Sequence, residues 1–189
     1  YLSLFDYQIP DKIYRMVLTL YKLDLSPPVR AVLMTIEALK IPDVNYVDVN
    51  LMEGENFKEE FVKMNPQQTI PMLKDDDFII WDSHAIAGYL ISTYGEDDSL
   101  YPKDPKKRAI IDQRLHFDSG ILTIGLFDTL NYLLLFYSET LNKFKSAYDF
   151  TDKFLTTPWI AGDELTVADI CCVSTISSMN DILPIDENK

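Results

Sequence analysis

The pattern of apolar and polar positions first alternates as in strands and later repeats only as in helices. Two short β-type runs cover 17–23 and 44–50. Between them Val29, Val32 and Ile36 recur at helical spacing, which predicts one helix with a buried stripe. A strand, a helix and a second strand at this spacing predict a βαβ unit with parallel strands.

A hairpin signal follows the βαβ unit. Apolar runs at 69–74 and 78–81 flank an acidic tip at 75–77, and this arrangement predicts a β-hairpin with a polar turn. Helical spacing then covers 83–94. A βαβ unit followed by a hairpin and a helix is the layout of a thioredoxin-like α/β domain.

The segment from Gly95 to Arg108 is polar and carries two prolines, which is typical of a domain linker. Beyond it the pattern is helical throughout, so we expect an all-α second domain. The expected helices cover 109 to about 136, 139–155 and 166 to about 180. The expected organisation is an extension over 1–15, a thioredoxin-like domain over 16–95, a linker over 96–108 and an all-α domain over 109–189.

The last expected helix has a marked start. Thr166 stands at the N-cap position and Asp169 follows three residues later, which is the pattern of a capping box. We therefore interpret Asp169 as a folding residue rather than a catalytic acid.

Composition places the chain among ordinary globular proteins, with 47% hydrophobic and 25% charged residues. No apolar run reaches the roughly 18 residues of a membrane span, so we expect no membrane partner. The net charge is −13, and contacts with a phosphate backbone would work against this field. Nucleic acid is therefore not an expected partner.

Both cysteines, Cys171 and Cys172, are adjacent within an apolar helical pattern. Side chains of neighbouring helical residues point about 100° apart, so a bridge between them is unfavourable. No ligand set for a metal accompanies them. We expect reduced thiols in the core and no metal site.

Five segments together resemble one known family. They are SPPVR (26–30), NPQQTIP (65–71), DSHAI (82–86), SLYPKDP (99–105) and AGDELTVAD (161–169). In this order they resemble the cytosolic glutathione S-transferases of the insect delta/epsilon type, with epsilon favoured. The resemblance implies transfer of glutathione, the co-substrate, to small apolar electrophiles. It also implies detoxification as the role, a homodimer and a cytoplasmic location.

Ser26 matches the serine that activates glutathione in the family. An ordinary thiol has a pKa of about 8.5, and lowering it by two units requires about 2.7 kcal/mol of thiolate stabilisation. A hydroxyl at a helix N-terminus offers a hydrogen bond and a favourable dipole. The simpler interpretation is that Ser26 only caps the helix, and Tyr21 is a weaker candidate for activation.

Glutathione contacts are implied around the expected cis peptide bond of Ile70 and Pro71. The cis turn leaves the backbone groups of Ile70 free to pair with the cysteinyl unit. Asp82 and Ser83 match the positions that hold the γ-glutamyl end, and helix capping by them is compatible with that role. The other residues implied in binding are Asn56, Gln68, Thr69 and His84.

Several positions depart from the family pattern. Gln68 and Asn56 stand where histidine is common, and neither can carry charge, so we expect weaker glutathione binding. The apolar substrate pocket is expected at Thr123, Leu126, Phe127 and Leu130. Asp128 is an acid on this apolar helix. It has three possible interpretations: exposure to solvent, pairing with another side chain, or contact with a polar group of the substrate.

Both ends of the chain also depart from the family. Residues 1–15 have no counterpart, and Met16 coincides with the family's usual start, whereas the chain stops at Lys189 before further expected helices. We expect an incomplete helical domain. Two rival functions follow: a non-catalytic carrier of glutathione or apolar ligands such as steroids, and an interaction domain, against which the SPPVR segment argues.

Overall fold

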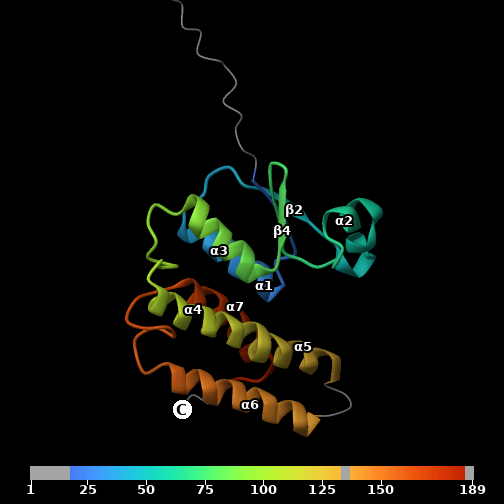
Figure 1. The fold of residues 1–189 in the computed structure, drawn as a ribbon. Coiled ribbons are helices and arrows are strands. Elements are labelled where there is room, and N and C mark those ends of the chain that lie inside the picture. The colour runs from blue at the N-terminus through green and yellow to red at the C-terminus, as the bar shows by residue number, and fades with distance from the viewer. Residues whose placement is uncertain (1–17, 133–136, 186–189) are drawn as a thin grey trace, which may run out of the picture.

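The computed structural model describes residues 18–132 and 137–185, with side chains described for 18–128 and 142–185. The expected extension over 1–15, Met16 and Lys189 lie outside this part of the chain. The described residues form a half built on a β-sheet and a half built from helices (Figure 1).

The sheet has four strands in the order β2-β1-β3-β4. Their bounds are Leu18–Lys22 for β1, Asn45–Asp48 for β2, Met72–Asp75 for β3 and Phe78–Trp81 for β4. β1 pairs with β2 in parallel and with β3 antiparallel, and β3 pairs antiparallel with β4. The predicted thioredoxin-like sheet, a βαβ unit followed by a hairpin, is confirmed.

Side chains along the strands point alternately to the two faces of the sheet, and each face has its own core. Leu20 and Leu73 are opposite each other on β1 and β3, and both face α1 (Pro27–Ala38) and α3 (Ser83–Tyr94). Met72 faces the other side of the sheet and packs with Phe61 of α2 (Glu59–Met64). Figure 1 shows α1 and α3 together, with α2 apart from them.

The connection from β2 to β3 contains elements that the sequence pattern did not predict. Two 3₁₀ turns, Leu51–Glu53 and Glu55–Phe57, precede the short helix α2. Asn50 begins the first turn, because its side chain accepts hydrogen bonds from the N–H groups of Met52 and Glu53. Elements this short do not complete enough turns for apolar periodicity to reveal them.

The second half is helical, as predicted. Its helices are α4 (Pro105–Phe117), α5 (Thr123–Tyr132), α6 (Tyr137–Phe154) and α7 (Val167–Ile182). The single helix expected from 109 is divided into α4 and α5 by a π-helical turn, Asp118–Leu122. α4 also begins earlier, since Asp104 accepts hydrogen bonds from the N–H groups of Lys106 and Lys107 and caps it.

α7 joins the two halves. It packs against α1 and α4, and its buried Cys171 and Ala168 share one core with Ala31 of α1 and Ala87 of α3. The predicted capping box at its start is present. The Asp169 carboxylate accepts hydrogen bonds from the N–H and the hydroxyl of Thr166, each at 2.9 Å. The sheet half therefore packs against the helical half through α7.

Candidate active site

Ser26 stands at the N-cap of α1 with an extended backbone, and two prolines follow it as the first helical residues. The turn before it is closed by a hydrogen bond from the Ser26 N–H to the Leu23 carbonyl at 2.9 Å. Its hydroxyl forms no capping bond and has no partner among the described residues. Ser26 is partly exposed, and its hydroxyl is available to a ligand at a helix N-terminus.

The peptide bond between Ile70 and Pro71 is cis, as the family resemblance implied. The N–H and C=O of Ile70 form no hydrogen bond with the rest of the described chain. The side chain of Asn65 fixes this loop from the interior of the protein. It is fully buried, and its amide donates to the Thr69 carbonyl at 2.8 Å and accepts from the Gln67 N–H at 2.9 Å. The loop thus presents a free backbone edge from a fixed position.

Asn56 lies under the same loop rather than at the surface. Only 8% of the residue is exposed, and its amide donates to the Gln68 carbonyl at 2.9 Å. The sequence suggested that Asn56 contacts a ligand, whereas its donor group here supports the backbone. Gln68 itself adopts a left-handed backbone with φ of 60°, and Thr69 beside it is exposed.

Asp82 begins α3 from a strained backbone, with φ of 79°. One carboxylate oxygen accepts hydrogen bonds from the N–H groups of His84 and Ala85, at 3.0 and 3.1 Å, so the helix-capping interpretation is correct. The Asp82 side chain is nonetheless 59% exposed and can contact a ligand. Ser83, next to it, is 7% exposed. Backbone strain of this kind collects at functional sites.

His84 points away from the sheet toward the helical half. Its Nε2 atom lies 2.8 Å from the Asp118 carboxylate in the π-helical turn. Asp118 is 3% exposed, and its second oxygen has no hydrogen-bond partner among the described residues. The first turn of α3 is therefore fixed to the junction of α4 and α5.

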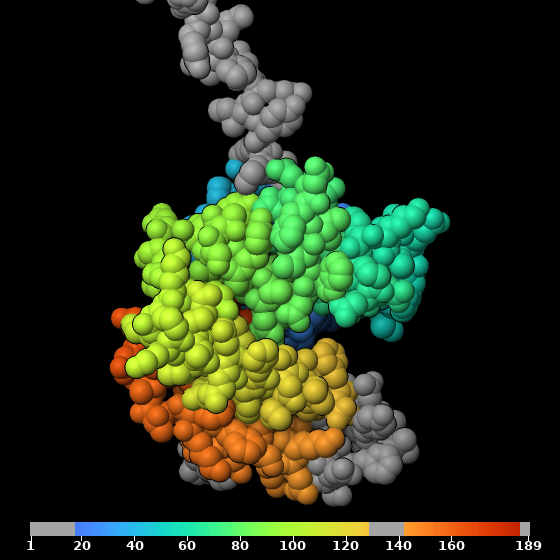
Figure 2. Space-filling model, in the orientation of Figure 1, coloured from blue at the N-terminus to red at the C-terminus, as the bar shows by residue number. Residues whose placement is uncertain are grey.

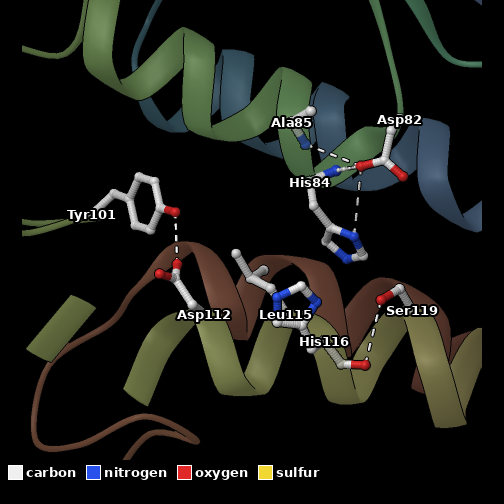
Figure 3. Close-up of a pocket in the computed structure, with 8 residues that line it drawn as sticks. All are labelled: Asp82, His84, Ala85, Tyr101, Asp112, Leu115, His116 and Ser119. Atoms are coloured by element: carbon white, nitrogen blue, oxygen red, sulfur yellow. Dashed lines mark hydrogen bonds and ion pairs between the residues drawn. The ribbon is translucent and has the colours of Figure 1, made fainter. Parts of the chain in front are cut away.

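A cavity of about 420 Å³ opens between the start of α3 and α4, and Asp82 and His84 form one wall (Figure 3). His116 and Ser119 lie opposite, and Tyr101 closes one side with its hydroxyl 2.7 Å from the Asp112 carboxylate. Burial raises the pKa of Tyr101. In Figure 2 the surface is hollowed between the two halves, and part of the dark-blue N-terminal portion of the coloured chain is visible in this hollow.

The expected apolar substrate pocket falls on α5, but its residues differ in access. Phe127 is 44% exposed and Thr123 is partly exposed, whereas Leu126 is 2% exposed and packs in the helical core. The expected place of Leu126 in the substrate pocket stays a prediction. The side chain of Leu130 lies outside the described residues. Asp128 pairs with Lys143 of α6, with 2.8 Å between carboxylate and ammonium.

Both cysteines are free and buried, in accord with the expected reduced core thiols. Burial raises the pKa of each thiol well above its ordinary value. Among the described residues no cluster of three or more acidic, histidine or cysteine side chains could hold a metal ion. In the same residues no helix is long and apolar enough to cross a membrane.

Residues 20–98 match the model of the glutathione S-transferase N-terminal domain. Over 179 residues the chain is 67% identical to glutathione S-transferase 1 of Manduca sexta, covering 92% of this chain and 82% of the relative. The chain belongs to the glutathione S-transferase family. The Drosophila melanogaster transferase D7 is 45% identical over 86% of this chain and 75% of its own.

Solved structures place this transferase among insect delta and epsilon enzymes. A glutathione transferase homologue from Drosophila mojavensis, solved with bound glutathione, is 44% identical with a TM-score of 0.86, over 92% of this chain and 82% of that one. An epsilon-class transferase from the housefly is also 44% identical, with a TM-score of 0.85 over 91% and 82%. The resemblance inferred from the five segments is confirmed.

Two residues of this transferase that the sequence did not single out hold the candidate site in place. Asp118 follows a helix that already carries charged residues, Asp112 among them, so nothing in the local sequence singled it out. Asn65 opens the NPQQTIP segment, but its role depends on complete burial, which no local pattern reveals. The structure thus adds supporting residues to a site whose exposed members were expected.

Proposed function

We propose that this transferase conjugates glutathione to small apolar electrophiles, with Ser26 stabilising the glutathione thiolate. The observation that carries the proposal is the Ser26 hydroxyl, which stands at a helix N-terminus without a partner among the described residues. A hydrogen bond from this hydroxyl and the helix dipole both favour the thiolate over the thiol. The sulfur then forms a bond to an electrophilic carbon, and the leaving group departs with its electron pair.

The remaining residues are proposed to hold the two substrates. The free backbone groups of Ile70 suit the cysteinyl unit as an added strand, and the exposed Asp82 suits the α-amine of the γ-glutamyl end. Ser83, at the first turn of α3, suits its carboxylate. Gln68, Thr69 and His84 complete the proposed glutathione contacts. Thr123 and Phe127 are proposed to face the apolar substrate, and the parts expected for Leu126 and Leu130 stay predictions from the sequence.

We also propose a homodimer, a cytoplasmic location and a role in detoxification, which the family relationship supports. Asn56 enters this proposal as a support for the loop of Gln68 rather than as a direct ligand contact.

The test is the ionisation of bound glutathione. Thiolate absorbance of the complex is measured across pH for the unaltered chain, Ser26→Ala and the control Ser92→Ala, whose hydroxyl donates to the Gly88 carbonyl within α3. We expect a bound-thiol pKa well below about 8.5 that rises in Ser26→Ala alone, together with loss of aryl halide turnover. Binding with an unshifted thiol pKa and no turnover would instead identify a carrier of glutathione or apolar ligands.

A further inference from the structure

Arg30 connects the turn that carries Ser26 to α7. Its Nη1 donates to the Leu25 carbonyl at 3.0 Å, and its Nη2 donates to the Ser174 carbonyl at 3.0 Å and to the hydroxyl of Ser178. One planar guanidinium thus holds a carbonyl next to Ser26 and the backbone of a helix 144 positions away. Arginine suits this task because its donors form a rigid fork.

The carbonyl of the residue after Ser26 is also held by α7. The Ser174 hydroxyl donates to the Pro27 carbonyl, and Ser174 is 2% exposed. The carbonyls before and after Ser26 are therefore both attached, directly or through Arg30, to neighbouring turns of one helix. Since α7 belongs to the helical half, that half helps to hold the turn that carries Ser26.

The charge of Arg30 is not used in a salt bridge within the described residues. The closest groups that it contacts are carbonyls and hydroxyls, and no carboxylate pairs with it. In a chain with a net charge of −13, this places an uncompensated cation beside the first turn of α1. A cation and a helix N-terminus at one place both favour a bound anion.

We propose that Arg30 is a positioning residue for Ser26, and that its link between Leu25 and α7 keeps the bound glutathione thiol ionised at neutral pH. The inference rests on the proposed function and extends that site into the helical half. Arg30 acts through Ser26 and through its charge, with no bond to the reacting sulfur required.

The test compares Arg30→Lys with Arg108→Lys. Lysine keeps the positive charge, but its single ammonium cannot bridge the Leu25 carbonyl and α7 as the guanidinium does. Arg108 is a matched control, because it also donates to two loop carbonyls, those of Tyr101 and Pro102, at the start of α4.

For Arg30→Lys we expect a raised pKa of the bound glutathione thiol and a kcat at pH 7 that falls about tenfold to hundredfold, with a smaller change in KM. Activity recovers as pH rises, since the thiol then ionises without help. Arg108→Lys keeps the unaltered pH profile.

A second variant, Ser178→Ala, removes one hydrogen bond of the Arg30 guanidinium and leaves Arg30 itself in place. It tests the proposed role of Arg30 if Arg30→Lys does not fold. We expect a smaller shift of thiol pKa in the same direction. An unshifted pKa in the folded variants overturns the inference, and so does an equal shift in Arg108→Lys, which would indicate a general loss of stability. If Ser26→Ala alone shifts the pKa, only the inference on Arg30 fails. If the unaltered chain binds no ionised thiol, the proposed function fails with it.

Discussion

The Nε2 atom of His84 lies 2.8 Å from the buried carboxylate of Asp118, and this contact connects the start of α3 to the junction of α4 and α5. A carboxylate with 3% exposure has little water to replace a lost partner. His84→Ala should therefore lower the free energy of unfolding by about 1–3 kcal/mol. Urea unfolding of His84→Ala, Asp118→Asn and the double variant measures this coupling.

We expect the double variant to lose less than the sum of the two single variants, by about 0.5–3 kcal/mol. Strict additivity would show that the 2.8 Å contact contributes nothing to stability in solution.

Asn65 is expected to support both stability and glutathione binding. Asn65→Ala removes the donor to the Thr69 carbonyl and the acceptor of the Gln67 N–H, and so leaves buried polar groups unpaired. We expect a loss of about 1–3 kcal/mol in unfolding free energy and weaker retention on immobilised glutathione. The exposed Asn45→Ala on β2 is the control and should change neither. Unchanged retention by a folded Asn65→Ala would separate this loop from glutathione binding.

The two thiols should be inert in the folded protein. Cys171 and Cys172 are 1% and 2% exposed, and burial raises the pKa of both thiols. Iodoacetamide reacts with the thiolate, so at pH 8 we expect no alkylation of the native chain and two alkylated cysteines in denaturant. Intact mass gives the count. Rapid native labelling would mean that α7 opens far more readily than its packing suggests.

Tyr148 should make stability depend on pH in alkaline solution. Burial raises the pKa of Tyr148 from 10.0 to about 12, and its hydroxyl donates to the Leu183 carbonyl at 3.1 Å. A raised pKa in the folded state stabilises the fold below pH 10 and ceases to do so as pH rises through about 12. Unfolding free energy should therefore fall between these values.

Urea unfolding of Tyr148→Phe across this range is the check, and its pH dependence should be shallower than that of the unaltered chain. Some dependence remains, because burial also raises the pKa of Tyr94. Identical slopes for both proteins would assign the alkaline loss to other groups.

The sequence pattern predicted elements with strong local signals. α3 begins at Ser83 and ends at Tyr94 as expected, because the hairpin before it and Gly95 after it fix both ends. The Thr166 capping box likewise placed the start of α7. The π-helical turn at Asp118 was missed, since apolar spacing continues through it and only the backbone hydrogen bonds change.

The candidate site was predictable where residues are exposed and less so where they are buried. Ser26 and Asp82 stand at helix starts, which the sequence marks. Asn56 was expected at the ligand but lies under the loop of Gln68, because an amide can serve the backbone as well as a substrate. Arg30 could not be assigned, since its partners on α7 are 144 positions away and are brought close only by tertiary packing.

This separation along the chain has a consequence for biosynthesis. At roughly 5–20 residues per second, α1 leaves the ribosome about 7–30 s before the residues of α7 that hold its first turn. During that interval the side of α1 that later packs on α7 has no permanent cover. Ser26 is translated well before the residues of α7 that support its turn, so this turn acquires its final contacts only after α7 has been made.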